Sequence, residues 1–303
     1  MESLVSFSKW LSKWFTVAVI LWAAFNYALP ATSSWVIPNT AYLLGLILFG
    51  MGLTLTTEDF KRIAKRPIPV VLGTVAHYVI MPGLAWLLCM IFHLKGATAA
   101  GVILVGSCPS GTSSSVMAFL SGGDVALDVS IETLSTLLSF LAGQYVSVPA
   151  QSLFLSTLRI VVVPIILGVL IHSIFGKKID AIIKIMPLIS QAAILLIVGA
   201  VVSANHANIF TAATALVIPV VMLHNLCGYA LGFGFSKILG LEEPQQKAIT
   251  FEVGMQDSSL GATLAMKYFV PQAAIPSTIF SIWHNISGSI LSSWWKNHSK
   301  NNQ

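Results

Sequence analysis

Residues 105–115 read VGSCPSGTSSS, which places a proline, two glycines and a cluster of hydroxyl side chains in a segment otherwise apolar enough to cross a bilayer. A second apolar segment is interrupted at 252–259 by EVGMQDSS, which adds two carboxylates. Proline and glycine disfavour a continuous helix. Free backbone groups at membrane depth are tolerated only where they are buried in protein or line a cavity. Each stretch therefore predicts a helix that is broken inside the membrane.

The composition is that of a membrane protein. Of the 303 residues, 56% are hydrophobic and 9% are charged, and the mean hydropathy is +0.84. A soluble domain carries about 25% charged residues. A window of about 19 residues predicts apolar spans at 14–30, 36–55, 68–93, 97–121, 124–147, 152–175, 181–203, 209–237, 244–269 and 272–295. The expected fold class is an all-α polytopic membrane protein with ten transmembrane helices.

The two interrupted spans divide the ten into halves of five. In each half a Val-Gly pair, Val105-Gly106 or Val253-Gly254, precedes the polar break, and one further span follows the interrupted one. Because five is odd, the second half crosses the membrane in the opposite sense. We therefore expect two inverted five-helix repeats, at 1–150 and 151–303. Broken helices in matching positions of two repeats point to a transport site.

Lysine and arginine are unevenly distributed over the predicted loops. With the N-terminus inside, only Lys95, Arg159 and Lys267 of the 16 Lys and Arg residues fall outside. Cytoplasmic loops are enriched in these residues, so we expect a cell (inner or plasma) membrane protein with both termini in the cytoplasm. The net charge of +5 follows from this asymmetry and predicts no nucleic-acid partner. Nothing in the sequence indicates an organic cofactor or an obligate protein partner.

Four carboxylates lie inside the apolar spans: Asp128, Glu132, Glu252 and Asp257. An ionisable group at membrane depth costs about 3 kcal/mol or more, and such groups usually mark an ion or substrate path. Asp128 and Glu132 are four residues apart and so share one helix face. A hard cation prefers oxygen ligands, which Glu252 and the carbonyls freed by the break beside it can supply. These residues predict a transporter.

Six strings in this chain resemble the bile acid:sodium symporter family, particularly its bacterial members. They are LGLILFGMGLTLTTEDFKR (44–62), CPSGTSSSVM (108–117), DVALDVSIETLSTL (124–137), LHNLCGY (223–229), EVGMQDSSLGATLA (252–265) and FSIWHNISGSILSSWW (280–295). The resemblance implies a panel domain of the spans 14–30, 36–55, 152–175 and 181–203. It also implies a core domain of the other six, in which the discontinuous spans 97–121 and 244–269 cross. The implied activity is sodium-coupled symport of organic anions by alternating access.

The resemblance also implies site residues. A first sodium ion would be bound by Ser114, Ser115, Asp128, Glu132 and Glu252, and a second by His77, Glu252, Val253, Met255 and Gln256. A cavity for a small organic substrate would be lined by Thr112, Asp257, His284 and Asn285. His224 and Asn225 are expected to form hydrogen bonds between helices instead.

The chain departs from the family pattern at the first sodium site. Ser115 stands where the family usually has Asn, and Asp128 and Glu132 stand where it has Ser or Thr. Three acids around one sodium leave excess negative charge, so at least one should be protonated and protons should compete with sodium. The alternative is that Asp128 and Glu132 face cytoplasmic water. His77 offers a nitrogen, a poor sodium ligand, so the second site should be weaker or sensitive to protons.

Asp257 stands where the family has Asn. An ionised carboxylate only accepts hydrogen bonds and would repel an anionic substrate. Either Asp257 is protonated, or the substrate carries a positive or donor-rich group, or this side chain belongs to the helix packing. Packing is also the alternative role for His284, and a protonated, hydrogen-bonded acid is the alternative for Glu252.

Other classes of function fit less well. An intramembrane aspartyl or serine protease would need catalytic motifs that do not surround Asp128, Asp257 or Ser110, so we do not expect an enzyme. A membrane receptor without transport would usually carry a soluble signalling domain, and such a domain is not expected after Trp295. The main alternative is a proton-coupled or mixed proton and sodium transporter of the same fold, with a zwitterionic or cationic substrate.

Overall fold

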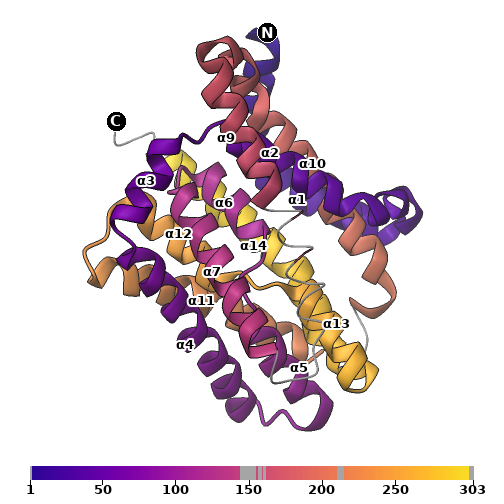
Figure 1. Cartoon of the computed structure of the whole chain (residues 1–303). Helices are drawn as coiled ribbons and strands as arrows, with labels where there is room; N and C mark the ends of the chain where they lie inside the picture. The colour runs from indigo at the N-terminus through magenta and orange to yellow at the C-terminus, as the bar shows by residue number, and fades with distance from the viewer. Residues whose placement is uncertain (1, 144–154, 156–158, 160–161, 210–214, 300–303) are drawn as a thin grey trace.

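The structure is a computed structural model that describes residues 2–143, 155, 159, 162–209 and 215–299. Within these ranges every regular element is a helix (Figure 1). The α-helices are α1 (Glu2–Ala28), α2 (Thr40–Gly52), α3 (Thr57–Lys65), α4 (Ile68–Ile91), α5 (Gly96–Gly106), α6 (Ser113–Ser121), α7 (Val125–Gly143), α9 (Val163–Phe175), α10 (Asp180–Ile209), α11 (Val217–Ile238), α12 (Glu243–Gly254), α13 (Ser258–Tyr268) and α14 (Ile275–Ser299). Short 3-10 helices cover Pro30–Thr32, Ser34–Asn39, Gly176–Ile179 and Pro271–Ala274.

Several helices are long and apolar enough to cross a membrane. Four candidate spans lie at Pro30–Gly52, Ile68–Ile91, Asp180–Ala204 and Val217–Ile238, and shorter apolar helices lie at Trp14–Ala28, Gly96–Gly106 and Val163–Phe175. Together with the apolar composition, these helices identify an all-α membrane protein. The predicted start of the second repeat near residue 151 lies outside the described residues. So do the end of the predicted span 124–147, most of the first ten residues of the span 152–175, and residues 210–214 of the span 209–237.

Both predicted breaks are present. The apolar segment 97–121 is divided into α5 and α6, with the non-helical turn at residues 107–112 between them. The segment 244–269 is divided into α12 and α13 around Met255–Asp257. The proline and the glycines that predicted the first break lie within it or at its edges, as expected from their effect on a helix.

The span predicted at 36–55 differs from expectation in its first turns. Residues Ser34–Asn39 form a 3-10 helix that contains Pro38, and the α-helix starts only at Thr40. The ring of a proline clashes with a preceding turn of α-helix. After this span comes α3, a short helix in the region between the predicted spans 36–55 and 68–93. Thr56 and Asp59 form a capping box at its start, and such a cap satisfies the free amides of a first turn.

The helices pack as two groups (Figure 1). In the first helix group α1 packs on α10, and α2 packs on both α9 and α10. In the second helix group α4, α11 and α12 contact one another and α7 packs on α4 and α12, with α5, α6, α13 and α14 completing the group. Contacts of α1 and α10 with α14, and of α2 with α6, join the groups. The two groups are therefore joined mainly through α14 and α6.

The turn between α6 and α7 positions the acids of α7. Gly122 has φ 74°, a left-handed conformation that glycine adopts without a steric cost. Asp124 follows it and accepts a hydrogen bond from the amide of Leu127 over 3.1 Å. Its other oxygen lies 3.2 Å from the guanidinium of Arg62 on α3. The turn therefore sends α7 back alongside α6, and Asp128 lies in its first turn.

Candidate functional site

The two breaks lie against each other and satisfy each other's backbone groups. Ser110 and Gln256 form an isolated antiparallel bridge. The amide of Asp257 donates to the carbonyl of Pro109 over 2.8 Å. Buried backbone groups need such partners because no water reaches them at membrane depth. The predicted crossing of the two interrupted helices is therefore built from paired main chain.

Glycine is required at this crossing. A Cβ atom at Gly111 would lie 2.6 Å from the carbonyl oxygen of Gln256, closer than such atoms approach. The amide of Gly111 also donates to the carbonyl of Met255, over 3.4 Å. Gly111 thus lets the two main chains meet.

Neighbouring helices fix the end of α12. The side-chain amide of Asn225 on α11 donates to the carbonyl of Gly254 over 2.8 Å, and Ser287 on α14 donates to the Asn225 side-chain oxygen over 2.7 Å. His224 Nε2 lies 2.9 Å from the carbonyl of Met81 on α4. The prediction that His224 and Asn225 form hydrogen bonds between helices is confirmed.

Asp128, Glu132 and Glu252 converge beside the crossing. One carboxylate oxygen from each lies within 4.8 Å of the others. The three side chains are 0%, 1% and 0% exposed, respectively. The expected convergence of α7 on Glu252 is therefore present, and the alternative that Asp128 and Glu132 face water is wrong. We refer to these three residues as the carboxylate cluster.

Two serines at the start of α6 join the cluster. Ser114 Oγ donates to Glu252 Oε1 over 2.5 Å. Ser115 Oγ lies 2.5 Å from Asp128 Oδ2 and 3.0 Å from Glu132 Oε2. A hydroxyl carries a single proton, so Ser115 can donate to only one of these two carboxylates at a time. The second carboxylate beside Ser115 therefore lacks this donor, and the three acids lie close together. Both features require a bound cation or protons on the carboxyl groups.

The cluster has the ligand chemistry of a hard-cation site. Asp128 Oδ1 and Glu252 Oε2 are buried and have no hydrogen-bond partner among the described residues. Burying a carboxylate oxygen without compensation is costly, and carboxylate and hydroxyl oxygens are the ligands that hard cations prefer. Lys247, on α12 near Glu252, instead contacts Glu243 over 2.8 Å and the carbonyl of Ser121 over 3.2 Å. These observations fit a site for a hard cation.

The residues of the predicted second sodium site are close together but largely bonded to one another. The carbonyl of Glu252 lies 2.8 Å from His77 Nδ1, and that of Val253 accepts from the Gln256 side chain over 3.2 Å. The carbonyl of Met255 accepts from the amide at the first break, as described above. The side-chain oxygen of Gln256 is buried without a partner among the described residues. Of the described groups of this site, this oxygen and Glu252 Oε2 are without a hydrogen-bond partner.

His77 links the two breaks. Its Nδ1 faces the carbonyl of Glu252 and its Nε2 lies 3.0 Å from the carbonyl of Cys108. The ring is 0% exposed. A neutral imidazole donates through one nitrogen only, whereas the imidazolium donates through both. The ring therefore bridges the two breaks and donates to at least one of the two carbonyls.

The four predicted substrate residues occupy different surroundings. Asn285 lines a small cavity with Ser113 of α6 and with Leu44, Ile194 and Ile197 of the first helix group. His284 is 4% exposed and packs edge-on to Phe280, with ring centroids 5.4 Å apart. Thr112 is the residue that precedes α6.

Asp257 is the N-cap of α13. Its Oδ1 accepts a hydrogen bond from the amide of Leu260 over 3.0 Å. This hydrogen bond supports the interpretation that Asp257 belongs to the helix packing. The next two residues, Ser258 and Ser259, line a cavity of about 190 Å³ with Thr40, Thr278 and Ser281. Hydroxyl groups from both helix groups thus gather beside Asp257. The sequence alone does not predict this cavity, although Ser258 and Ser259 lie in the string EVGMQDSSLGATLA.

Comparisons with known proteins agree with this architecture. The sodium bile acid symporter family model matches residues 41–212. The uncharacterized sodium-dependent transporter YocS of Bacillus subtilis is 42% identical over 100% of this chain and 97% of its own length. The probable chloroplastic sodium/metabolite cotransporter BASS1 of Arabidopsis thaliana is 33% identical over 97% of this chain and 78% of its own, and BASS2 of Oryza sativa is 37% identical over 95% and 71%. The chain therefore belongs to the sodium bile acid symporter family, a family of transporters rather than enzymes.

Proposed function

We propose that this protein is a symporter that couples sodium entry to the uptake of a small organic acid or bile-acid-like compound. The sodium ion is held by the carboxylate cluster with Ser114 and Ser115. One observation carries this proposal: three buried carboxylates from α7 and α12 lie within 4.8 Å of one another at the crossing of two broken helices. Such a cluster is stable only with positive charge bound among its oxygens.

Sodium binding drives the transport cycle because it changes the charge at the crossing of the two broken helices. The first helix group is the panel domain and the second is the core domain of a ten-helix fold with two inverted repeats and cytoplasmic termini. An ion at the cluster removes the repulsion between α7 and α12 and stabilises the paired breaks. A ligand that favours one conformation shifts the population toward it, so sodium and substrate together favour the conformation that exposes the panel–core cavity to the other side.

Protons take part in the same site. The extra acids give the cluster more negative charge than one sodium ion neutralises, so the cluster retains at least one proton with sodium bound. Proton release then accompanies sodium binding. We propose sodium as the driving ion and the proton as its competitor. A second sodium would be bound by His77, Glu252, Val253, Met255 and Gln256. The carbonyls of Glu252, Val253 and Met255 already have hydrogen-bond partners, so this ion binds more weakly.

The substrate lies between Asn285 and the hydroxyl-lined cavity next to Asp257. Uptake by proteoliposomes tests the proposal. Purified protein is reconstituted, and candidate organic acids are first selected by their effect on thermal stability. A sodium gradient at fixed pH should drive accumulation of the selected compound, and an equal potassium gradient should not. Equal accumulation with the two ions would rule out sodium coupling.

A further inference from the structure

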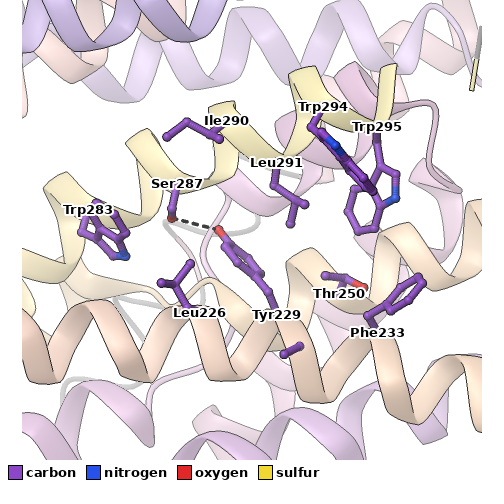
Figure 2. Close-up of a pocket in the computed structure, with 11 residues that line it drawn as sticks. Leu226, Tyr229, Phe233, Thr250, Trp283, Ser287, Ile290, Leu291, Trp294 and Trp295 are labelled. Carbon is purple, nitrogen blue, oxygen red and sulfur yellow. Dashed lines mark hydrogen bonds between the residues drawn. The ribbon is translucent and has the colours of Figure 1, made fainter. Parts of the chain in front are cut away.

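A groove unrelated to the carboxylate cluster runs between α11 and α14. It has a volume of about 530 Å³, and its floor and walls come from α11, α12 and α14 (Figure 2). Its lining is Leu226, Tyr229, Ala230, Phe233, Thr250, Trp283, Ser287, Ile290, Leu291, Trp294 and Trp295. The volume is within the range of small-ligand sites. The groove is therefore large enough to hold part of a molecule.

The groove faces away from the panel–core boundary. Trp283 and Trp294 lie on the side of α14 opposite Asn285, because residues two or nine apart point to roughly opposite helix faces. Asn285 lines a cavity together with residues of the first helix group. Trp294 and Ile290 are 50% and 40% exposed. In a protein that spans the membrane, this outward face is in contact with lipid.

The hydroxyls of the lining have partners within the protein, whereas the buried Trp283 Nε1 has none among the described residues. The Tyr229 and Ser287 hydroxyls form a hydrogen bond (Figure 2), with 3.4 Å between their oxygens, and Ser287 donates to Asn225. Thr250 donates to the carbonyl of Gln246 over 2.7 Å. These hydroxyls are satisfied within the protein, so an occupant gains mainly apolar contacts with the aromatic and aliphatic side chains.

The length of the groove corresponds to one leaflet. From Trp283 to Trp294 the helix rises roughly 16 Å at 1.5 Å per residue. Half of a hydrocarbon core of about 30 Å is about 15 Å. The tryptophans at the C-terminal end, Trp294 and Trp295, are of the type that collects at membrane–water interfaces. An acyl chain aligned with the groove would place its polar end beside them.

Basic residues flank that same end. Lys237 is exposed, and its ammonium lies 5.7 Å from the ring centroid of Phe233, which lines the groove. Lys296 directly follows Trp295. A lysine near the membrane surface attracts anionic lipid. We propose that the groove between α11 and α14 binds one acyl chain of an anionic glycerophospholipid, whose phosphate is held by Lys237.

Fluorescence quenching tests this proposal, since three of the eight tryptophans line the groove. The whole protein is placed in phosphatidylcholine bilayers that contain increasing fractions of brominated phosphatidylglycerol or brominated phosphatidylcholine. We expect the phosphatidylglycerol to quench at lower mole fractions. The substitution Lys237→Gln should weaken this preference about fivefold, the factor that corresponds to about 1 kcal/mol for one surface lysine. The matched control Lys184→Gln, at an exposed lysine of α10, should leave it unchanged.

A second pair of variants tests the groove itself. Ala230→Phe fills it and should lower the quenching by both lipids, whereas Ile174→Phe, at a 73% exposed position of α9, should not. Equal quenching curves for the two lipids in the parent protein, or equal effects of Lys184→Gln and Lys237→Gln, would overturn the proposal. A reconstituted dimer that Ala230→Phe dissociates would also overturn it, because a second copy would then be the occupant.

Discussion

Ser114 donates a hydrogen bond of 2.5 Å to Glu252, which joins α6 of the first half of the chain to α12 of the second half. Both side chains are 0% exposed. This contact places an oxygen from each interrupted helix at the carboxylate cluster. Ion binding there therefore affects both breaks at once.

Removing this hydroxyl should weaken sodium binding. Ser114→Ala deletes one oxygen ligand and a hydrogen bond to a charged group, a contact that contributes about 1.5–3 kcal/mol. We expect a loss of sodium affinity between about tenfold and a hundredfold, measured as the sodium concentration that half-saturates the thermal shift of the purified protein.

Ser121→Ala is the matched control for Ser114→Ala. Ser121 is also a buried serine of α6, but its hydroxyl donates to the carbonyl of Ala118. Its replacement should leave the sodium affinity unchanged. If the two variants had the same affinity, Ser114 would be a packing residue.

The sodium affinity should depend on pH. Protons and sodium compete for the carboxylate cluster, so the affinity should rise as the pH rises from about 5 to 8. The double substitution Asp128→Ser and Glu132→Thr removes two of the acids and should flatten this dependence. Sodium titrations at several pH values measure the slope. Glu58→Gln, at an exposed carboxylate of α3, serves as the control, and an unchanged slope in the double variant would assign the protons to other groups.

Substitutions at Asp257 can distinguish the effect of its charge from its structural role as a helix cap. Asparagine caps a helix as well as aspartate does, so Asp257→Asn should keep α13 and remove only the charge. We expect faster uptake of carboxylate substrates at neutral pH, because an anion is no longer repelled. Asp257→Ala, by contrast, should lose about 1 kcal/mol of stability with the cap. An unchanged substrate profile in Asp257→Asn would restrict this residue to its role as a helix cap.

The close approach at Gly111 predicts a large effect from one methyl group. In Gly111→Ala the added Cβ would press on the main chain of Gln256, which should separate the paired breaks and lower both thermal stability and sodium-driven uptake. Gly234→Ala in α11 is the control. Nothing lies within 4 Å of a Cβ at that position, so the variant should be as stable as the parent or up to about 1 kcal/mol more stable. Similar melting temperatures for the two variants would contradict the tight crossing.

The sequence predicted the parts of the fold that depend on local chemistry. Pro109 and Gly111 predicted the first break, and the four-residue spacing of Asp128 and Glu132 predicted that both acids share one helix face. It did not predict α3, because the short capped helix has no apolar run of membrane length.

The hydrogen bonds of Asp257 and His77 could not be predicted from the sequence because they depend on tertiary structure. The hydrogen bond of Asp257 to Leu260 depends on where α13 begins, and the two carbonyls that face His77 come from segments 31 and 175 residues away. Neither arrangement has a pattern in the sequence around these residues. The family resemblance pointed to His77 as a ligand but could not show how it is bonded.

The most direct test of sodium binding at the carboxylate cluster is the thermal stability of the purified protein against sodium or potassium, in the parent and in Glu252→Gln. A ligand at a hundred times its dissociation constant adds about 2.7 kcal/mol to the stability of the folded state. We predict that sodium raises the melting temperature of the parent in a saturable manner, that potassium at the same ionic strength does not, and that Glu252→Gln remains folded but loses the response to sodium. Equal shifts with sodium and potassium, or a full sodium response in Glu252→Gln, would contradict the account.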